Sequence, residues 1–122
     1  MFTLLVVSED PERRDQLQDW LSQEGFKVPT AKDIRTGLSK LLSEQPGLTI
    51  IHISGEKNLQ ALIELAARMT PYTIVLSDDP SNVEASVALC ILGADFYEPD
   101  SLRKSELTAR INALLRRATL VA

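Results

Sequence analysis

Five short apolar runs, each followed by a segment of helical periodicity, restrict the fold of this chain more than any other feature. Continuous apolar runs rich in β-branched residues are typical of strands buried on both faces. The runs are TLLVV (3–7), FKVPTA (26–31), LTIIHI (48–53), YTIVLS (72–77) and ADFYE (94–98). Strands that alternate with helices need right-handed crossovers and form a parallel sheet covered on both faces. The order therefore predicts an α/β protein with a doubly wound, five-stranded parallel sheet, (βα)5.

Capping residues delimit the amphipathic segments between these runs. Asp10 is placed to cap the first helix, Pro11 suits its first turn, and Gly25 ends it. Asp33 is placed to cap the second helix in the same way. Apolar stripes with a period of 3.6 residues predict the remaining helices around 59–69, 83–91 and 107–115.

Length and composition indicate one globular domain inside the cell. The 122 residues are enough for one core, and 44% hydrophobic with 25% charged residues is an ordinary balance. The apolar runs are too short to cross a bilayer, and the N-terminus lacks the basic region of a signal peptide. With a single cysteine, Cys90, these features predict a cytoplasmic protein. Cys90 falls in an apolar helical pattern and is interpreted as a small buried hydrophobe.

The charge of the chain is unevenly distributed. The net charge of −4 argues against a domain that itself binds a nucleic-acid backbone. From position 101 onward five basic residues stand against Glu106 alone, a balance of +4, so the preceding residues carry −8. A basic last helix on an acidic body predicts a self-complementary or partner-facing surface; ordinary solvated faces are the alternative.

Polar side chains gather where the predicted strands end. In an open parallel sheet, ligands bind beyond the carboxyl ends of the strands. The strand-end residues are Ser8, Glu9 and Asp10 after the first strand, His52 and Ser54 after the third, Ser77 and Asp78 after the fourth, and Tyr97 to Asp100 after the fifth. His52 is the only histidine in the chain. We therefore expect the functional site at this edge of the sheet, around His52.

Four segments carry a resemblance to a known family. They are LLVVSEDPERRDQL (4–17), QPGLTIIHI (45–53), GADFY (93–97) and SELTARINALLRR (105–117). In this order and spacing the chain resembles a receiver domain of bacterial two-component response regulators over essentially its full length. The last segment resembles the final helix of the OmpR/PhoB subfamily. The resemblance implies the flavodoxin-like, CheY-like receiver fold.

The resemblance also implies a set of groups that a working receiver needs. An aspartate takes a phosphoryl group, two acidic residues hold Mg²⁺, and a lysine contacts the phosphoryl oxygens. A Ser or Thr hydroxyl then hydrogen-bonds the product and moves a switch aromatic residue. Because this chemistry consists mainly of electrostatic positioning, losing the charges removes the activity.

Matched to those positions, this chain has lost most of the charges. The acidic pair falls on Ser8 and Glu9, the phosphoacceptor on His52, and the lysine on Asp100. Only the hydroxyl, Ser77, and the switch aromatic, Tyr97, are compatible with the family pattern. Glu9 with Asp10 would make a weak Mg²⁺ site. The resemblance thus predicts a pseudo-receiver that is not an enzyme and uses no metal or cofactor.

Several roles for His52 stay open at this point. The favoured one is an imidazole hydrogen-bonded to Ser54, Ser77 or the backbone. Phosphohistidine lacks a positive group to hold the phosphoryl oxygens, and a metal site with Glu9, Asp10 and Asp100 would have one nitrogen ligand. A protonated imidazole is a further alternative, because its charge would replace that of the missing metal and lysine.

Other nucleophile and phosphoacceptor roles are less favoured. Ser8 and Ser54 show neither a base–orienter pair nor a glycine-flanked elbow in the sequence. Asp78 or Asp79 as a displaced phosphoacceptor competes with simple turn formation.

The resemblance further implies a two-fold dimer face built by the fourth helix, fifth strand and fifth helix. The residues matched to it are Asp95, Phe96, Glu106, Arg110 and Arg117. Phe96 stands where the subfamily has an acid, and an aromatic anchor can dominate an interface. We therefore hypothesise constitutive homodimerisation centred on Phe96, with burial of Phe96 in the core as the alternative.

The domain is predicted over residues 1–118, with 119–122 as a tail or the start of a linker. The predicted function is a phosphorylation-independent module that acts by protein–protein contact. It would control an attached DNA-binding output domain, and contact nucleic acid only through that domain. The alternatives are residual phosphotransfer or metal response through Glu9, Asp10 and His52, and sensing of a small molecule. These predictions include no membrane partner, whereas a signalling protein partner is possible.

Overall fold

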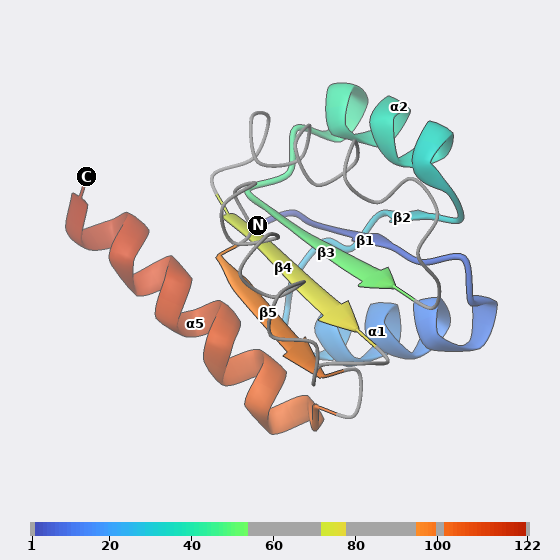
Figure 1. The fold of residues 1–122 in the computed structure, drawn as a ribbon. Helices are drawn as coiled ribbons and strands as arrows, with labels where there is room; N and C mark the ends of the chain where they lie inside the picture. Colours follow the sequence, from blue (N-terminus) through green and yellow to red (C-terminus); the bar gives the residue numbers. More distant parts are fainter. Residues whose placement is uncertain (1, 54–71, 78–94, 100–101, 122) are drawn as a thin grey trace.

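A computed structural model describes residues 2–53, 72–77, 95–99 and 102–121 of the chain (Figure 1). The predicted third and fourth helices lie outside these residues. The same is true of Ser54, Asp78, Asp79, Cys90 and Asp100.

The sheet is parallel and has five strands in the order β2-β1-β3-β4-β5 (Figure 1). The strands are β1 (Leu4–Val7), β2 (Thr30–Ala31), β3 (Leu48–Ile53), β4 (Tyr72–Ser77) and β5 (Phe96–Pro99). The third and fourth strands match the predicted runs residue for residue. The predicted parallel α/β sheet is therefore confirmed.

Three predicted strands differ in extent from those in the structure. The first was predicted over 3–7 and is found at Leu4–Val7, with Thr3 in an isolated bridge. The second was predicted over 26–31, but β2 contains only Thr30 and Ala31, and Lys27 adds an isolated bridge to Thr3. Pro29 lies between Lys27 and β2. It has no N–H to donate, so the hydrogen bonding to β1 is interrupted at Pro29. The fifth was predicted over 94–98 and is found at Phe96–Pro99. Asp95 precedes it and is tied to β4 through its carboxylate, which the pattern of apolar residues does not reveal.

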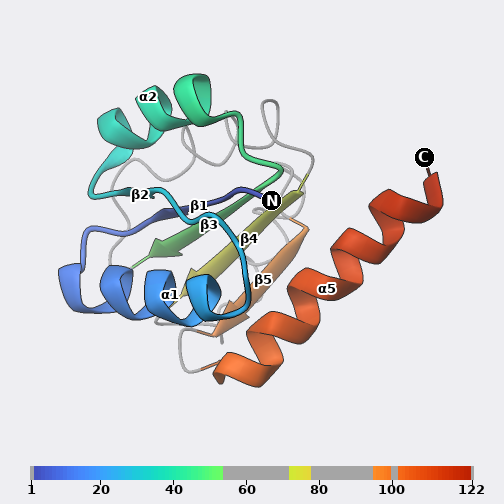
Figure 2. The same cartoon turned by 180° about the vertical axis from the view of Figure 1, so that it is seen from behind.

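Two of the described helices pack on the same face of the sheet. α1 (Pro11–Gln23) and α5 (Lys104–Val121) both stand before the sheet in Figure 2. Their buried side chains join those of the strands in one apolar cluster: Leu4, Val6, Leu17, Leu21, Val28, Leu48, Ile50, Ile74, Leu76, Leu102, Leu107, Ile111 and Leu114. α2 (Ile34–Glu44) packs against β1 and β2, away from α1 and α5 (Figure 1).

Both predicted caps are present. The Asp10 carboxylate accepts hydrogen bonds from the backbone N–H groups of Glu12, at 3.0 Å, and Arg13, at 3.3 Å. Gly25 follows the end of α1 with φ +93° and donates to the carbonyl of Ser22. A positive φ is the conformation for which glycine is suited, so the predicted stop signal is confirmed.

The cap of α2 changes the acidity of its carboxyl group. Asp33 accepts a hydrogen bond from the backbone N–H of Thr36 at 2.7 Å. That bond, followed by one from the Thr36 side chain, lowers the pKa of Asp33 below its usual value of 3.8. Both bonds favour the charged form of the carboxyl group.

The turn into β3 places Gly47 against an aromatic ring, so a larger residue there would need the Phe2 side chain to move. A Cβ atom added at Gly47 would lie 2.5 Å from Cζ of the Phe2 ring, closer than carbon atoms can approach. Phe2 packs against the apolar cluster and makes an edge-to-face contact with Phe26. The break predicted at QPG (45–47) therefore also leaves room for the aromatic ring.

The last helix, α5, extends past the predicted end of the domain at position 118. It begins at Lys104, where Glu106 accepts hydrogen bonds from the backbone N–H and the guanidinium of Arg103. It continues to Val121, past position 118, so residues 119–121 are helical. The domain boundary itself stays a prediction. None of the helices that the structure describes is long and apolar enough to cross a membrane.

Candidate functional site

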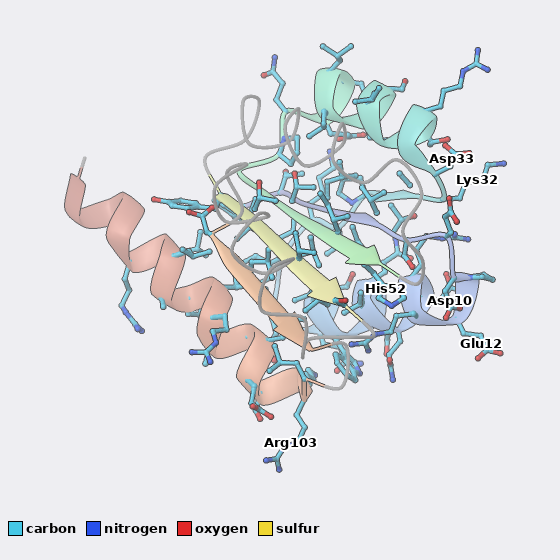
Figure 3. The ribbon with its side chains drawn as sticks, viewed as in Figure 1. Asp10, Glu12, Lys32, Asp33, His52 and Arg103 are labelled. Carbon is cyan, nitrogen blue, oxygen red and sulfur yellow. The ribbon has the colours of Figure 1, made fainter. Side chains whose placement is uncertain are left out.

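A buried hydrogen bond joins the ends of the two neighbouring strands β1 and β3. Ser8, directly after β1, has its Oγ 2.8 Å from Nδ1 of His52, near the end of β3. Only 1% of Ser8 and 5% of His52 is exposed to solvent. Figure 3 shows His52 at the carboxyl end of β3. The predicted hydrogen-bond partners of His52 did not include Ser8, which the structure brings to it across 44 positions of the chain.

The strand pattern explains why these two side chains meet. Side chains alternate between the faces of a strand. Val6 and Ile50 belong to the apolar cluster beneath α1 and α5, so Ser8 and His52, each two residues further on, point to the same side. Because β1 and β3 are paired in register, their ends lie next to each other.

The Ser8 hydroxyl has more than one partner. Its Oγ accepts a hydrogen bond from the backbone N–H of Asp10 at 3.2 Å and lies 3.3 Å from the Asp10 carbonyl oxygen. In one arrangement His52 donates from Nδ1 to Ser8, which donates to that carbonyl. In the other, Ser8 donates to Nδ1. Only the first arrangement suits an imidazolium, in which both ring nitrogens are donors.

Among the described residues, the acidic residues of the predicted site, Glu9 and Asp10, make no hydrogen bond to His52. The carboxylate of Asp10 is engaged at the start of α1, as Figure 3 shows, and Glu9 is exposed. Among the described residues, no group of three or more His, Cys, Asp or Glu side chains is arranged to hold a metal ion. The side chains present at the ends of β1 and β3 therefore do not fit the Mg²⁺ site that the resemblance implies, since that ion needs several oxygen ligands.

A cation that the sequence interpretation missed lies next to this site. Nη1 of Arg14 donates a hydrogen bond to the backbone carbonyl of Ser8 at 3.0 Å. The position offers one signal that was overlooked: Arg14 follows the cap residue Asp10 by four positions, and so lies one helical turn into α1. Its bond fixes the backbone that carries the Ser8 side chain.

The structure places Ser77 at the same edge and Tyr97 further back along β5. Ser77 ends β4 and is 6% exposed, and it pairs in register with Ile53 while His52 pairs with Leu76. Leu76 belongs to the cluster beneath α1 and α5, so the side chain of Ser77 points to the opposite face from that of His52. Tyr97 lies in β5, opposite Val75.

The residues of the predicted dimer face have contacts within the chain. The Asp95 carboxylate accepts from the backbone N–H of Thr73 at 2.7 Å, and the Asp95 N–H donates to the Thr73 carbonyl at 2.8 Å. Glu106 pairs with Arg103 at 3.0 Å, with 84% of the Arg103 side chain exposed. Arg110 is exposed on α5. Phe96 and Arg117 are described only as members of β5 and α5.

Comparison with known proteins assigns the class. The computed fold superposes on a CheY-like receiver domain from Methanospirillum hungatei with a TM-score of 0.90 and 24% identity, covering 100% of this chain and 99% of that one. It superposes on a two-component response regulator from Clostridium difficile with a TM-score of 0.89 and 18% identity, covering 97% and 98%. The fold is therefore that of response regulator receiver domains.

Sequence comparison leads to the same family. The chain is 34% identical over 119 residues to the transcriptional regulatory protein CpxR of Escherichia coli K12, covering 97% of this chain and 51% of that one. It is 31% identical over 118 residues to the response regulator MprA of Mycolicibacterium vanbaalenii, covering 95% and 51%. No protein-family model matches it.

The chain belongs to the response regulators as a receiver domain, and the named relatives fit the OmpR/PhoB subfamily, as the resemblance predicted. It spans about half the length of the curated relatives that it matches.

Proposed function

We propose that this receiver domain signals without aspartyl phosphorylation, by contact with other proteins. The observation that supports this proposal is the buried hydrogen bond between Ser8 and His52. His52 occupies the position matched to the phosphoacceptor, and an imidazole cannot form the acyl phosphate that a carboxylate forms. His52 is also only 5% exposed, so its ring offers little surface to a phosphodonor.

The hydrogen bond has a structural role in this proposal. In the family that the chain resembles, two acidic residues, matched here to Ser8 and Glu9, would hold Mg²⁺ near the phosphoacceptor position, matched here to His52. Here Ser8 and His52 connect the same two strand ends directly, and Arg14 holds the Ser8 backbone. The site is thus closed by side chains of the domain itself, and it would hold one conformation in the presence and absence of Mg²⁺.

The output is proposed to be a homodimer that regulates an attached DNA-binding domain. The relatives include transcriptional regulators about twice as long as this chain, which supports a second domain in the whole protein. The proposed face comprises Asp95, Phe96, Glu106, Arg110 and Arg117, together with the fourth helix. Glu106 and Arg110 are exposed, so both are accessible to a second copy.

The test of phosphorylation independence uses acetyl phosphate and beryllofluoride, each with Mg²⁺. We expect no gain of a phosphoryl group by mass spectrometry and no Mg²⁺-dependent change in the NMR signals of His52 and Tyr97. A Mg²⁺-dependent phosphoryl adduct contradicts the proposal and favours residual phosphotransfer through Glu9, Asp10 or His52. A receiver with an intact phosphoacceptor serves as the positive control.

Dimerisation is tested separately by sedimentation of Phe96→Asp against the parent chain. A charge at the centre of a dimer interface is costly to bury, so the variant should sediment as a monomer. The matched control is Arg35→Asp, which places a carboxylate on the exposed side of α2, away from the proposed face. An unchanged mass for Phe96→Asp rules out this face as the dimer interface.

A further inference from the structure

Two threonines in the centre of the sheet have hydroxyl groups without a hydrogen-bond partner in the part of the chain that the structure describes. They are Thr49 in β3 and Thr73 in β4, and neither has any exposure to solvent. Buried hydroxyls are nearly always hydrogen-bonded, because leaving one unpaired loses the bonds it makes to water. Two such groups in one sheet therefore need an explanation.

The two side chains lie next to each other on the same face. Thr49 and Thr73 are paired in register between β3 and β4. Their neighbours Leu48, Ile50 and Ile74 belong to the cluster beneath α1 and α5, so both threonines point to the opposite face. Thr49 precedes His52 by three residues and Thr73 precedes Ser77 by four, so this pair lies away from the carboxyl edge described above.

The spacing of the strands suits one bridging water molecule. Neighbouring strands lie about 4.8 Å apart, and this spacing separates the backbones at the paired positions of Thr49 and Thr73. A water molecule that makes a bond of about 2.8 Å to each hydroxyl spans up to about 5.6 Å. Each hydroxyl can donate one bond and accept two, so both can bind the same water.

The backbone N–H and carbonyl groups of Thr73 already have partners. The N–H donates to the Asp95 carboxylate and the carbonyl accepts from the Asp95 N–H. We infer that Thr49 and Thr73 form an internal binding site for one water molecule, which bridges β3 and β4. The site lies outside the phosphorylation pocket and does not depend on the proposed function.

A single bridging water makes the two hydroxyls energetically dependent on each other. Removing one hydroxyl leaves the water with one fewer partner and the other hydroxyl poorly satisfied. Removing both removes the need for the water. The single substitutions Thr49→Val and Thr73→Val should therefore each lower the midpoint of thermal unfolding, by about 3–6 °C. The double variant should unfold well above the temperature that the sum of the two losses predicts.

Thr108→Val is the matched control. Thr108 in α5 also has a buried hydroxyl oxygen without a partner among the described residues, but no second unpartnered threonine is paired with it. Valine has the same shape, so this substitution should leave the unfolding midpoint unchanged or raise it. The NMR signals of His52, the only histidine, report whether each variant keeps the parent fold.

Water itself is detected by NMR in the parent protein. We expect nuclear Overhauser effects between a long-lived water molecule and the methyl groups of both Thr49 and Thr73, and their loss in the double variant. The absence of such a signal at either threonine in the parent overturns the inference. It is equally overturned if both single substitutions behave like Thr108→Val and their effects on the midpoint simply add.

Discussion

The face of the sheet beneath α1 and α5 and the carboxyl edge of the same sheet are stabilised by different means. The face is filled by apolar side chains, mainly from the strands β1, β3 and β4 and the helices α1 and α5. Many of these side chains have no exposure to solvent. At the edge, a buried hydrogen bond joins Ser8 and His52. Stability under the helices thus depends on volume, whereas stability at the edge depends on matched donors and acceptors.

The largest effect is expected beneath the helices. Ile50 is fully buried in the apolar cluster, so Ile50→Ala should lower the free energy of unfolding by about 2–5 kcal/mol, because it removes buried methyl groups and leaves a cavity. Urea denaturation measures the loss. Ile50→Val is the control and should cost about 0.5–1.5 kcal/mol. Equal losses for the two variants would mean that volume is not what this face requires.

A smaller loss is expected at the edge. Ser8→Ala changes the volume little but removes the partner of Nδ1 of His52, and should cost about 1–3 kcal/mol. Ser22→Ala is the control, because Ser22 is exposed on α1. In Ser8→Ala combined with His52→Phe, part of the loss should be recovered, since the unsatisfied ring nitrogen is gone. Strictly additive losses would show that the two side chains do not interact.

Asp10 caps the first turn of α1 and follows directly after the edge residue Ser8 and its neighbour Glu9. Asp10→Ala leaves the N–H groups of Glu12 and Arg13 without their acceptor and should cost about 1 kcal/mol. Asp10→Asn keeps an acceptor oxygen and should lose much less. Asp15→Ala, exposed in the same helix, controls for the loss of a carboxylate. Chemical denaturation ranks the three variants, and a loss in Asp15→Ala equal to that in Asp10→Ala contradicts a capping role.

The smallest effect concerns α2 and appears only in acid. Because folding lowers the pKa of Asp33 below 3.8, this group stabilises the folded state above that pH. The contribution is lost as the pH falls from 3.8 through the lower folded-state pKa. Asp33→Asn should therefore be less stable to unfolding than the parent at pH 7, and its stability should approach that of the parent at the lowest pH. Unfolding curves across this range measure the difference; a gap that stays constant with pH contradicts the assignment.

Local sequence signals account for most of the described fold. Apolar runs placed β3 and β4 at their observed positions, and Asp10, Gly25 and Asp33 marked the ends of helices, because each acts on backbone groups within four residues. The parallel sheet followed from the same alternation of strands and helices. The extent of β2 was wrong because Pro29 interrupts its pairing, and that of β5 was wrong where Asp95 acts across the sheet on Thr73.

Sequence by itself therefore determined the class of fold, which depends on periodicity, and placed Ser8 and His52 at the ends of their strands. The family resemblance came from four matched segments. Only the tertiary structure decided which side chains meet. Ser8 is 44 positions from His52, and Thr49 lies opposite Thr73 only because β3 and β4 pair in that register. A one-residue shift of a strand turns each side chain to the other face, and strands that are buried on both faces, as β3 and β4 are, carry little alternation of apolar and polar residues to fix that choice.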